Sequence, residues 1–213
     1  DFARFADFYA EMWSKENYLE GIFPCVGPIR YTGQAALQRD IDNLKAAMAA
    51  AGAKQGFLPV AAPASAFSMS PNQYYKTDEE YMYAGAEALR TEYKTITDAG
   101  LYVQIDDAHL PFTYDRMVPP ATPKEFRAWA RIRVDALNHA LRGIPEERVR
   151  YHICWGSWNG PHTADLPLEK IANLIVQVKA GGYSVEAANP RHAHEWKVWK
   201  DVKLPAGRSL LPG

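Results

Sequence analysis

The chain has 213 residues, 47% hydrophobic and 23% charged, and its 24 Lys and Arg nearly balance 25 Asp and Glu for a formal net charge of -1. This balance is typical of a globular protein, and it argues against intrinsic disorder and against a basic nucleic-acid-binding surface. Because there is no apolar run of about 18 residues and no basic-then-apolar N-terminus, we expect a soluble cytoplasmic protein without membrane contact.

Helical and strand-like patterns alternate along the chain. Leu37, Ile41 and Leu44 recur at helical spacing, whereas the strand-like segments are short apolar runs bounded by Gly and Pro. Thr77 and Thr122 are predicted N-caps, because each is followed three residues later by a Glu. The expected order is helix 2–13, strand 22–33, helix 34–51, strand 56–67, helix 77–100, strand 101–110, helix 122–141, strand 149–158, helix 168–182, strand 183–190, a short helix ending near 200, and a strand starting at 208.

This alternation predicts parallel strands joined by helical crossovers, in either a closed barrel or an open doubly wound sheet. Side-chain alternation favours the barrel, since three strands place polar groups on one face and apolar groups on the other. We therefore predict an α/β fold of the TIM (β/α)8 type, with residues 1–213 in a single domain. The polar pairs are Gln104 and Asp106, His152 and Cys154, and Ser184 and Glu186.

The predicted barrel is incomplete in this chain. Six strand-like segments are found, whereas closure needs eight strands and about 250 residues are typical of the fold. We therefore expect the chain to be a fragment that lacks the first and last strands of the barrel.

His152 and Cys154 are the strongest candidates for a metal site. They lie two residues apart on a predicted strand, so both side chains point to one face near the carboxyl end, where barrel enzymes have their active sites. Imidazole and thiolate are good zinc ligands, and Glu186 shares their face on the next predicted strand, about 4.8 Å away. We predict that the three residues bind one metal ion; the alternative is a solvated polar strand end.

Asp106 and Asp107 end another predicted strand at the same edge. Consecutive strand residues face opposite ways, so Asp106 shares the face of the metal candidates. Its carboxylate could bind a substrate ammonium group or act as an acid or base, and the alternative is a carboxylate that caps the following turn. Both Asp106 and Asp107 are predicted as substrate-binding residues.

Other residues with ligand chemistry are assigned to structure. His192 and His194 follow Asn189 and Pro190, which resemble the N-cap and first residue of a helix. Side chains two residues apart on a helix diverge, so we do not expect this pair to bind a metal. Cys25 lies in an apolar run and is expected to be a buried thiol, since two cysteines are too few for a disulfide framework.

Three motifs, in this order, resemble the cobalamin-independent methionine synthases, in particular their short single-barrel relatives in the uroporphyrinogen decarboxylase-like group. They are VQIDDAHL at 103–110, YHICWGSWNG at 151–160 and YSVEAANP at 183–190. The resemblance implies zinc bound by His152, Cys154 and Glu186. It further implies that Asp106 contacts the amino-acid part of a thiol substrate. The family's fourth zinc ligand is a cysteine on the last strand, and we expect it downstream of Gly213.

The activity that the resemblance implies is methyl transfer from a 5-methyltetrahydrofolate-type donor to homocysteine or a similar thiol, as in methionine synthesis. A free alkyl thiol with a pKa of about 8.5 is mostly protonated at neutral pH, and coordination to zinc deprotonates it. Two alternatives stay open. One is zinc-dependent thiol alkylation by an epoxide, as in the family's coenzyme M branch, and the other is a non-catalytic barrel that binds zinc or a small ligand.

Overall fold

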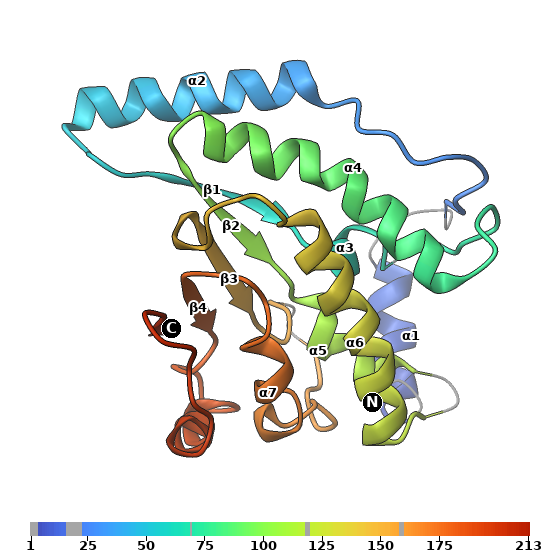
Figure 1. Ribbon diagram of the computed structural model, residues 1–213. Helices are drawn as coiled ribbons and strands as arrows, with labels where there is room; N and C mark the ends of the chain where they lie inside the picture. Colours follow the sequence, from blue (N-terminus) through green and yellow to red (C-terminus); the bar gives the residue numbers. More distant parts are fainter. Residues whose placement is uncertain (1–3, 16–22, 69, 118–119, 158–159) are drawn as a thin grey trace.

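The computed structural model describes residues 4–15, 23–68, 70–117, 120–157 and 160–213. Within these ranges, five parallel strands form one sheet in the order β1-β2-β3-β4-β5. Figure 1 shows β1 to β4 side by side. The α/β class and the parallel arrangement predicted from the alternating pattern are therefore confirmed. The strands are β1 (Phe57–Ala61), β2 (Tyr102–Asp106), β3 (Val149–Ile153), β4 (Gly182–Val185) and β5 (Ser209–Pro212).

Helices connect the strands, and α4 and α6 pack against each other beside the sheet (Figure 1). No helix in the described ranges combines the length and the hydropathy needed to cross a bilayer. The α-helices are α1 (Ala6–Lys15), α2 (Gln34–Ala51), α3 (Pro63–Ala66), α4 (Asp78–Asp98), α5 (His109–Arg116), α6 (Pro123–Ala140) and α7 (Ala172–Ile175), and the 3-10 helices are η1 (Glu146–Arg148), η2 (Leu168–Lys170) and η3 (Ala193–Lys200).

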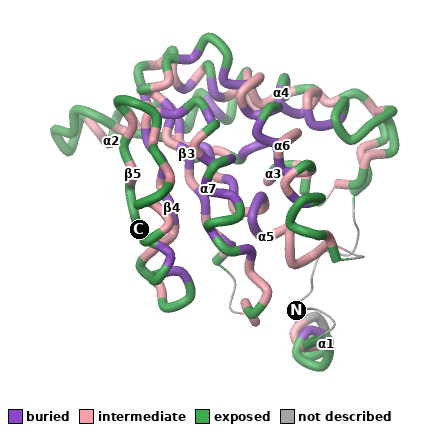
Figure 2. Tube along the Cα trace, turned by 60° about the horizontal axis from the view of Figure 1, so that its bottom comes forward, coloured by how far each residue is buried: buried purple, intermediate pink, exposed green. Residues whose placement is uncertain are grey.

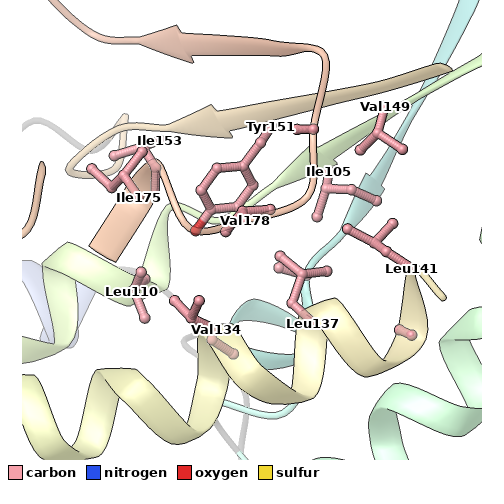
Figure 3. Packing of buried hydrophobic residues seen from close by; sticks show 14 of the residues in the cluster. Ile105, Leu110, Val134, Leu137, Leu141, Val149, Tyr151, Ile153, Ile175 and Val178 are labelled. Atoms are coloured by element: carbon pink, nitrogen blue, oxygen red, sulfur yellow. The ribbon is translucent and has the colours of Figure 1, made fainter. Parts of the chain in front are cut away.

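The core lies between the sheet and the helices. Buried positions concentrate on the strands and on the helices that cover them, whereas α2 is mostly exposed (Figure 2). Ile105 of β2 and Tyr151 and Ile153 of β3 are fully buried, and they lie opposite Val134 and Leu137 of α6 (Figure 3). Because these apolar side chains are removed from water, they stabilise the packing of α6 on the sheet.

Burial alternates along the strands as predicted. In β2, Val103 and Ile105 are buried, whereas Gln104 and Asp106 are half-buried on the opposite face. The same alternation in β3 and β4 puts polar side chains of three neighbouring strands on the face that is turned away from the core, among them His152.

The predicted count of six strands is wrong for the described residues, whose sheet has five strands. β1 and β5 are its two edges, so this sheet is open. Residues 23–33 of the predicted strand 22–33 contain only an isolated bridge, between Cys25 and Asn72, and residue 22 lies outside the described residues. The reason is that Pro24 and Pro28 lack the amide hydrogen that a sheet ladder requires.

The predicted helix 168–182 is also wrong in length. It is divided into η2 and the short α7, which ends at Ile175, and β4 then begins at Gly182. The chain between them packs closely on the segment before β3, because a Cβ at Gly181 would lie 2.8 Å from the Cα of Glu147. This close approach leaves no room for a side chain at position 181. The expected last helix is the 3-10 helix η3.

The helix α4 begins at the N-cap residue that the sequence predicts, Thr77, and the stabilising effect of this cap can be tested. Thr77 Oγ1 accepts a hydrogen bond from the Glu80 amide at 3.0 Å. Thr77→Ala is expected to lower the free energy of unfolding by about 1 kcal/mol in urea denaturation, because that amide loses its acceptor. The control is Thr91→Ala, at an exposed position inside the same helix, which should not destabilise the protein. Equal losses in both variants would contradict the capping role.

Candidate active site

Three predicted site residues line one cavity at the carboxyl ends of the strands. His152 lies in β3, Cys154 follows that strand, and Glu186 follows β4. The cavity has a volume of about 340 Å³ and is also lined by Ser184. In the sheet register, His152 is paired with Asp106 on one side and with Ser184 on the other. The parallel strands thus bring the sequence-distant motifs to one edge of the sheet.

The Glu186 carboxylate is held by neighbouring donors. Its Oε2 accepts a hydrogen bond from the Trp155 amide at 3.1 Å, and its Oε1 accepts one from the side-chain amide of Asn189. The Arg191 guanidinium is 3.9 Å from Oε1. On the other side of the cavity, His152 Nδ1 is 3.2 Å from Ser184 Oγ. Glu186 is therefore oriented by a fixed set of contacts.

The Cys154 thiol lies in a negatively charged environment. Burial raises the pKa of Cys154, and the carboxylates of Glu186, Asp106 and Asp107 raise it further, against the opposing effect of a hydrogen bond from the Gly156 backbone. The protein alone therefore keeps this thiol protonated at neutral pH. A thiolate at this position would need a nearby cation.

The chemistry and the charge of these residues show whether they are suitable ligands for zinc. An imidazole, a thiol and a carboxylate around one cavity are donor types of zinc sites. The carboxylates near Cys154 favour a cation, whereas the Arg191 guanidinium in the same cavity opposes one. Across the described ranges, no group of three or more His, Cys, Asp or Glu residues could hold a metal ion as it stands. The residue types fit zinc, but Glu186 would have to exchange some of its present contacts for the ion.

Asp106 lies on the same face as His152 but lines a neighbouring cavity. That cavity has a volume of about 310 Å³ and also includes Ser65 and His109. The side-chain amide of Gln104 donates a hydrogen bond to Asp106 Oδ1 at 2.9 Å. The register pairing with His152 nevertheless places Asp106 beside the metal candidates, as the spacing predicts.

Asp107 points the other way, toward the helices. It is 2% exposed, and it accepts hydrogen bonds from Tyr151 Oη at 2.8 Å and from Ser65 Oγ at 3.1 Å. Burial raises the pKa of Asp107 to about 6, even though these two hydroxyl groups and Arg133 favour the ionised form. This placement gives no support to the predicted substrate contact of Asp107, and we do not include it among the proposed substrate ligands.

Two cavity residues are not among the predicted site residues. The sequence identifies Ser184 only as the polar residue that shares a strand face with Glu186, and that shared face is the signal that could have placed it in the site. Arg191 carries no comparable signal, since it reaches the cavity from the segment that follows β4. Its position depends on how that segment folds back.

No protein-family model matches the chain. A methionine synthase of Sulfolobus acidocaldarius is 25% identical over 173 residues, which cover 79% of this chain and 44% of that protein. A 2-hydroxypropyl-CoM lyase of Xanthobacter autotrophicus is 28% identical over 88 residues, 41% of this chain and 19% of that protein. Among solved structures, a B12-independent methionine synthase from a Shewanella species, in complex with selenomethionine, superposes with a TM-score of 0.60 at 17% identity, over 88% of this chain and 51% of that one.

The chain is an α/β protein with a parallel sheet and polar residues at the carboxyl ends of its strands, and the proteins to which it is similar are enzymes. More specifically, the resemblance to cobalamin-independent methionine synthases that the three motifs predict is confirmed by these relatives. The chain spans less than half the length of the Sulfolobus protein that it matches.

Proposed function

We propose that this protein is a zinc-dependent thiol methyltransferase with His152, Cys154 and Glu186 as zinc ligands. The observation that carries the proposal is the single cavity shared by these three side chains at the carboxyl ends of parallel strands. Similarity to methionine synthases supports methyl transfer as the class of reaction. The proposed acceptor is homocysteine or a similar thiol, and the proposed donor is a methylated amine of the tetrahydrofolate type.

The sheet is, in this proposal, part of a TIM (β/α)8 barrel. Two observations support it: the five strands are parallel and follow one another in sequence order, and their polar residues share the face turned away from the helices. In such a barrel that face is the interior, and the carboxyl ends of the strands surround the active site.

The chemistry requires a deprotonated acceptor thiol. When bound, zinc supplies a positive charge that lowers the pKa of a coordinated thiol. As the acceptor sulfur bonds to the methyl carbon, the methyl–nitrogen bond of the donor breaks. The thiol proton is released, and the donor nitrogen takes up a proton, so the products are a thioether and a secondary amine.

Asp106 is the proposed contact for the ammonium group of an amino-acid thiol. Its Oδ1 is fixed by Gln104, and a carboxylate can accept several hydrogen bonds, so capacity remains for a substrate. Because Asp106 is paired with His152 in the register, a bound ammonium group would lie next to the thiol-binding side chains. Asp106 would thus orient the acceptor for attack.

The direct test is a methyl-transfer assay with the zinc-loaded protein. We expect thioether formation from a methyltetrahydrofolate donor with homocysteine, and slower formation with thiols that lack an ammonium group. The protein after removal of zinc with a chelator serves as the control and should be inactive. Zinc binding without turnover of any thiol would instead favour a non-catalytic binding protein.

Asp106→Asn tests the substrate contact. Loss of a charged hydrogen bond is expected to raise KM for homocysteine by about 10-fold. A thiol acid of the same length without the amine is the matched control substrate, and its KM should change little. If KM rises equally for both substrates, Asp106 has a structural role only.

Alkylation of a thiol by an epoxide is the second candidate, favoured by the similarity to 2-hydroxypropyl-CoM lyase. In that reaction the thiolate sulfur attacks an epoxide carbon, the ring carbon–oxygen bond breaks, and the oxygen takes up a proton. Coenzyme M has a sulfonate and no ammonium group, so Asp106 would not assist its binding. Activity with epoxypropane and coenzyme M, but not with homocysteine, would establish this candidate in place of the first.

A further inference from the structure

A buried ionic cluster lies beside the candidate site. The imidazole of His192 is between two carboxylates, with Nδ1 2.8 Å from Glu195 Oε2 and Nε2 3.3 Å from Asp165 Oδ2. His192 and Glu195 are only 4% and 8% exposed. Asp165 also contacts His162, whose Nδ1 is 2.9 Å from Oδ2. The neighbouring His194, in contrast, is exposed.

The cluster ties three separate segments together. Glu195 Oε1 accepts a hydrogen bond from the Leu168 amide at 2.7 Å, which joins η3 to the chain that precedes α7. The His192 ring stacks on the fully buried Trp155 ring, with centroids 3.9 Å apart and planes at 17°. The indole of Trp155 donates a hydrogen bond to the Leu166 carbonyl at 2.8 Å. His192 is therefore central to the packing of these segments.

Two chains of contacts run from His192 to Glu186. In the first, His192 packs on Trp155, whose backbone amide donates to Glu186 Oε2. In the second, the His192 backbone amide donates to Asn189 Oδ1 at 2.9 Å, and the Asn189 side-chain amide donates to Glu186 Oε1. The two groups that donate hydrogen bonds to the Glu186 carboxylate thus both belong to residues that contact His192.

The charge of His192 strengthens this arrangement. Burial lowers the pKa of His192, but the close contacts and negative charges of Asp165 and Glu195 outweigh burial and raise the pKa to about 9. The ring is therefore an imidazolium at neutral pH. A neutral aromatic ring could stack on Trp155, but it would leave the buried carboxylate of Glu195 and the half-buried one of Asp165 without the imidazolium between them.

We propose that His192 is a positioning residue, whose imidazolium between Asp165 and Glu195 holds Trp155 and Asn189 and thereby sets the orientation of Glu186. In the protein without metal, this orientation is a property of the chain alone. Its consequence for zinc rests on the proposed function, in which Glu186 is a ligand. Partners of this kind commonly tune metal affinity through the ligand that they orient.

Hydrogen exchange in the metal-free protein tests the proposal without reference to activity. We expect His192→Phe to speed exchange of the Trp155 amide by about 10-fold or more relative to the amide of Ile105, which reports on β2, an interior strand of the sheet. His194→Phe, the same substitution two residues away at an exposed position, should leave the ratio unchanged. A residue with only a general structural role would raise both exchange rates equally, and that result would overturn the proposal.

Glu195→Gln provides a second variant of nearly the same shape, in case His192→Phe does not fold. It should shift the Trp155-to-Ile105 ratio in the same direction, and an unchanged ratio would overturn the proposal. Zinc titration against a chelator then separates the positioning role of His192 from the proposed zinc function. His192→Phe or Glu195→Gln should weaken zinc affinity about 10-fold, whereas His194→Phe should not. If the wild-type protein binds no zinc, the proposed function fails, while the exchange ratio still decides the role of His192.

Discussion

Serine in place of Cys154 is expected to lower the affinity for zinc by on the order of 100-fold and to lower thiol methylation in parallel. A serine hydroxyl has nearly the same shape as the thiol, but it does not ionise near neutral pH and is a poor zinc donor. The substitution therefore removes the anionic ligand while it preserves packing around the cavity. Affinity is measured by competition with a chelator, and folding is checked by thermal unfolding.

The chain contains a matched control for this experiment. Cys25 is the other cysteine; it is half-buried, and its thiol donates a hydrogen bond to the Gly27 carbonyl at 3.3 Å. Cys25→Ser should retain both zinc and activity. The zinc proposal would be falsified if Cys154→Ser bound the ion as tightly as the wild type, or if Cys25→Ser lost it to the same extent.

The second large effect is on stability and concerns Asp107. Because this buried carboxyl group has a pKa of about 6, against 3.8 for an aspartate in water, the folded state holds its proton more tightly than the unfolded chain does. Its favourable contribution is complete below about pH 4 and is lost as the pH rises through about 6. The expected loss is about 3 kcal/mol in the free energy of unfolding.

Urea denaturation between pH 4 and 7 measures this contribution. Asp107→Asn cannot ionise, so its stability should lack the fall that the wild type shows as the pH rises. The adjacent Asp106→Asn leaves Asp107 intact and should retain the wild-type pH dependence. A wild-type curve without this fall, or an identical one for Asp107→Asn, would mean that Asp107 is not held in the buried environment that its contacts with Tyr151 and Ser65 define.

Much of the fold follows from local patterns. Apolar residues at helical spacing predict α2, and the caps at Thr77 and Thr122 predict where α4 and α6 begin. The alternation of polar and apolar residues also predicts which face of β2, β3 and β4 is buried. Each of these signals depends on residues that are close in sequence.

The sequence predicts the wrong conformation where contacts between distant segments override the local pattern. Residues 23–33 have an apolar composition, but they make only the bridge from Cys25 to Asn72. The segment after α7 has helical residue types, but Gly181 must lie against the backbone of Glu147 before β4 can pair with β3. Apolar composition indicates burial, but the partner strand or backbone decides which conformation is adopted.

For the site, the sequence was sufficient to predict that His152, Cys154 and Glu186 share one edge of the sheet. The reason is that alternate residues of a strand point to the same face. Tertiary structure alone decided the rest. His192 and His194 have the same side chain two residues apart, but only His192 lies between the carboxylates of Asp165 and Glu195. Charge and burial depend on which distant groups surround a side chain, and in this protein those groups come from segments that meet only when the chain folds.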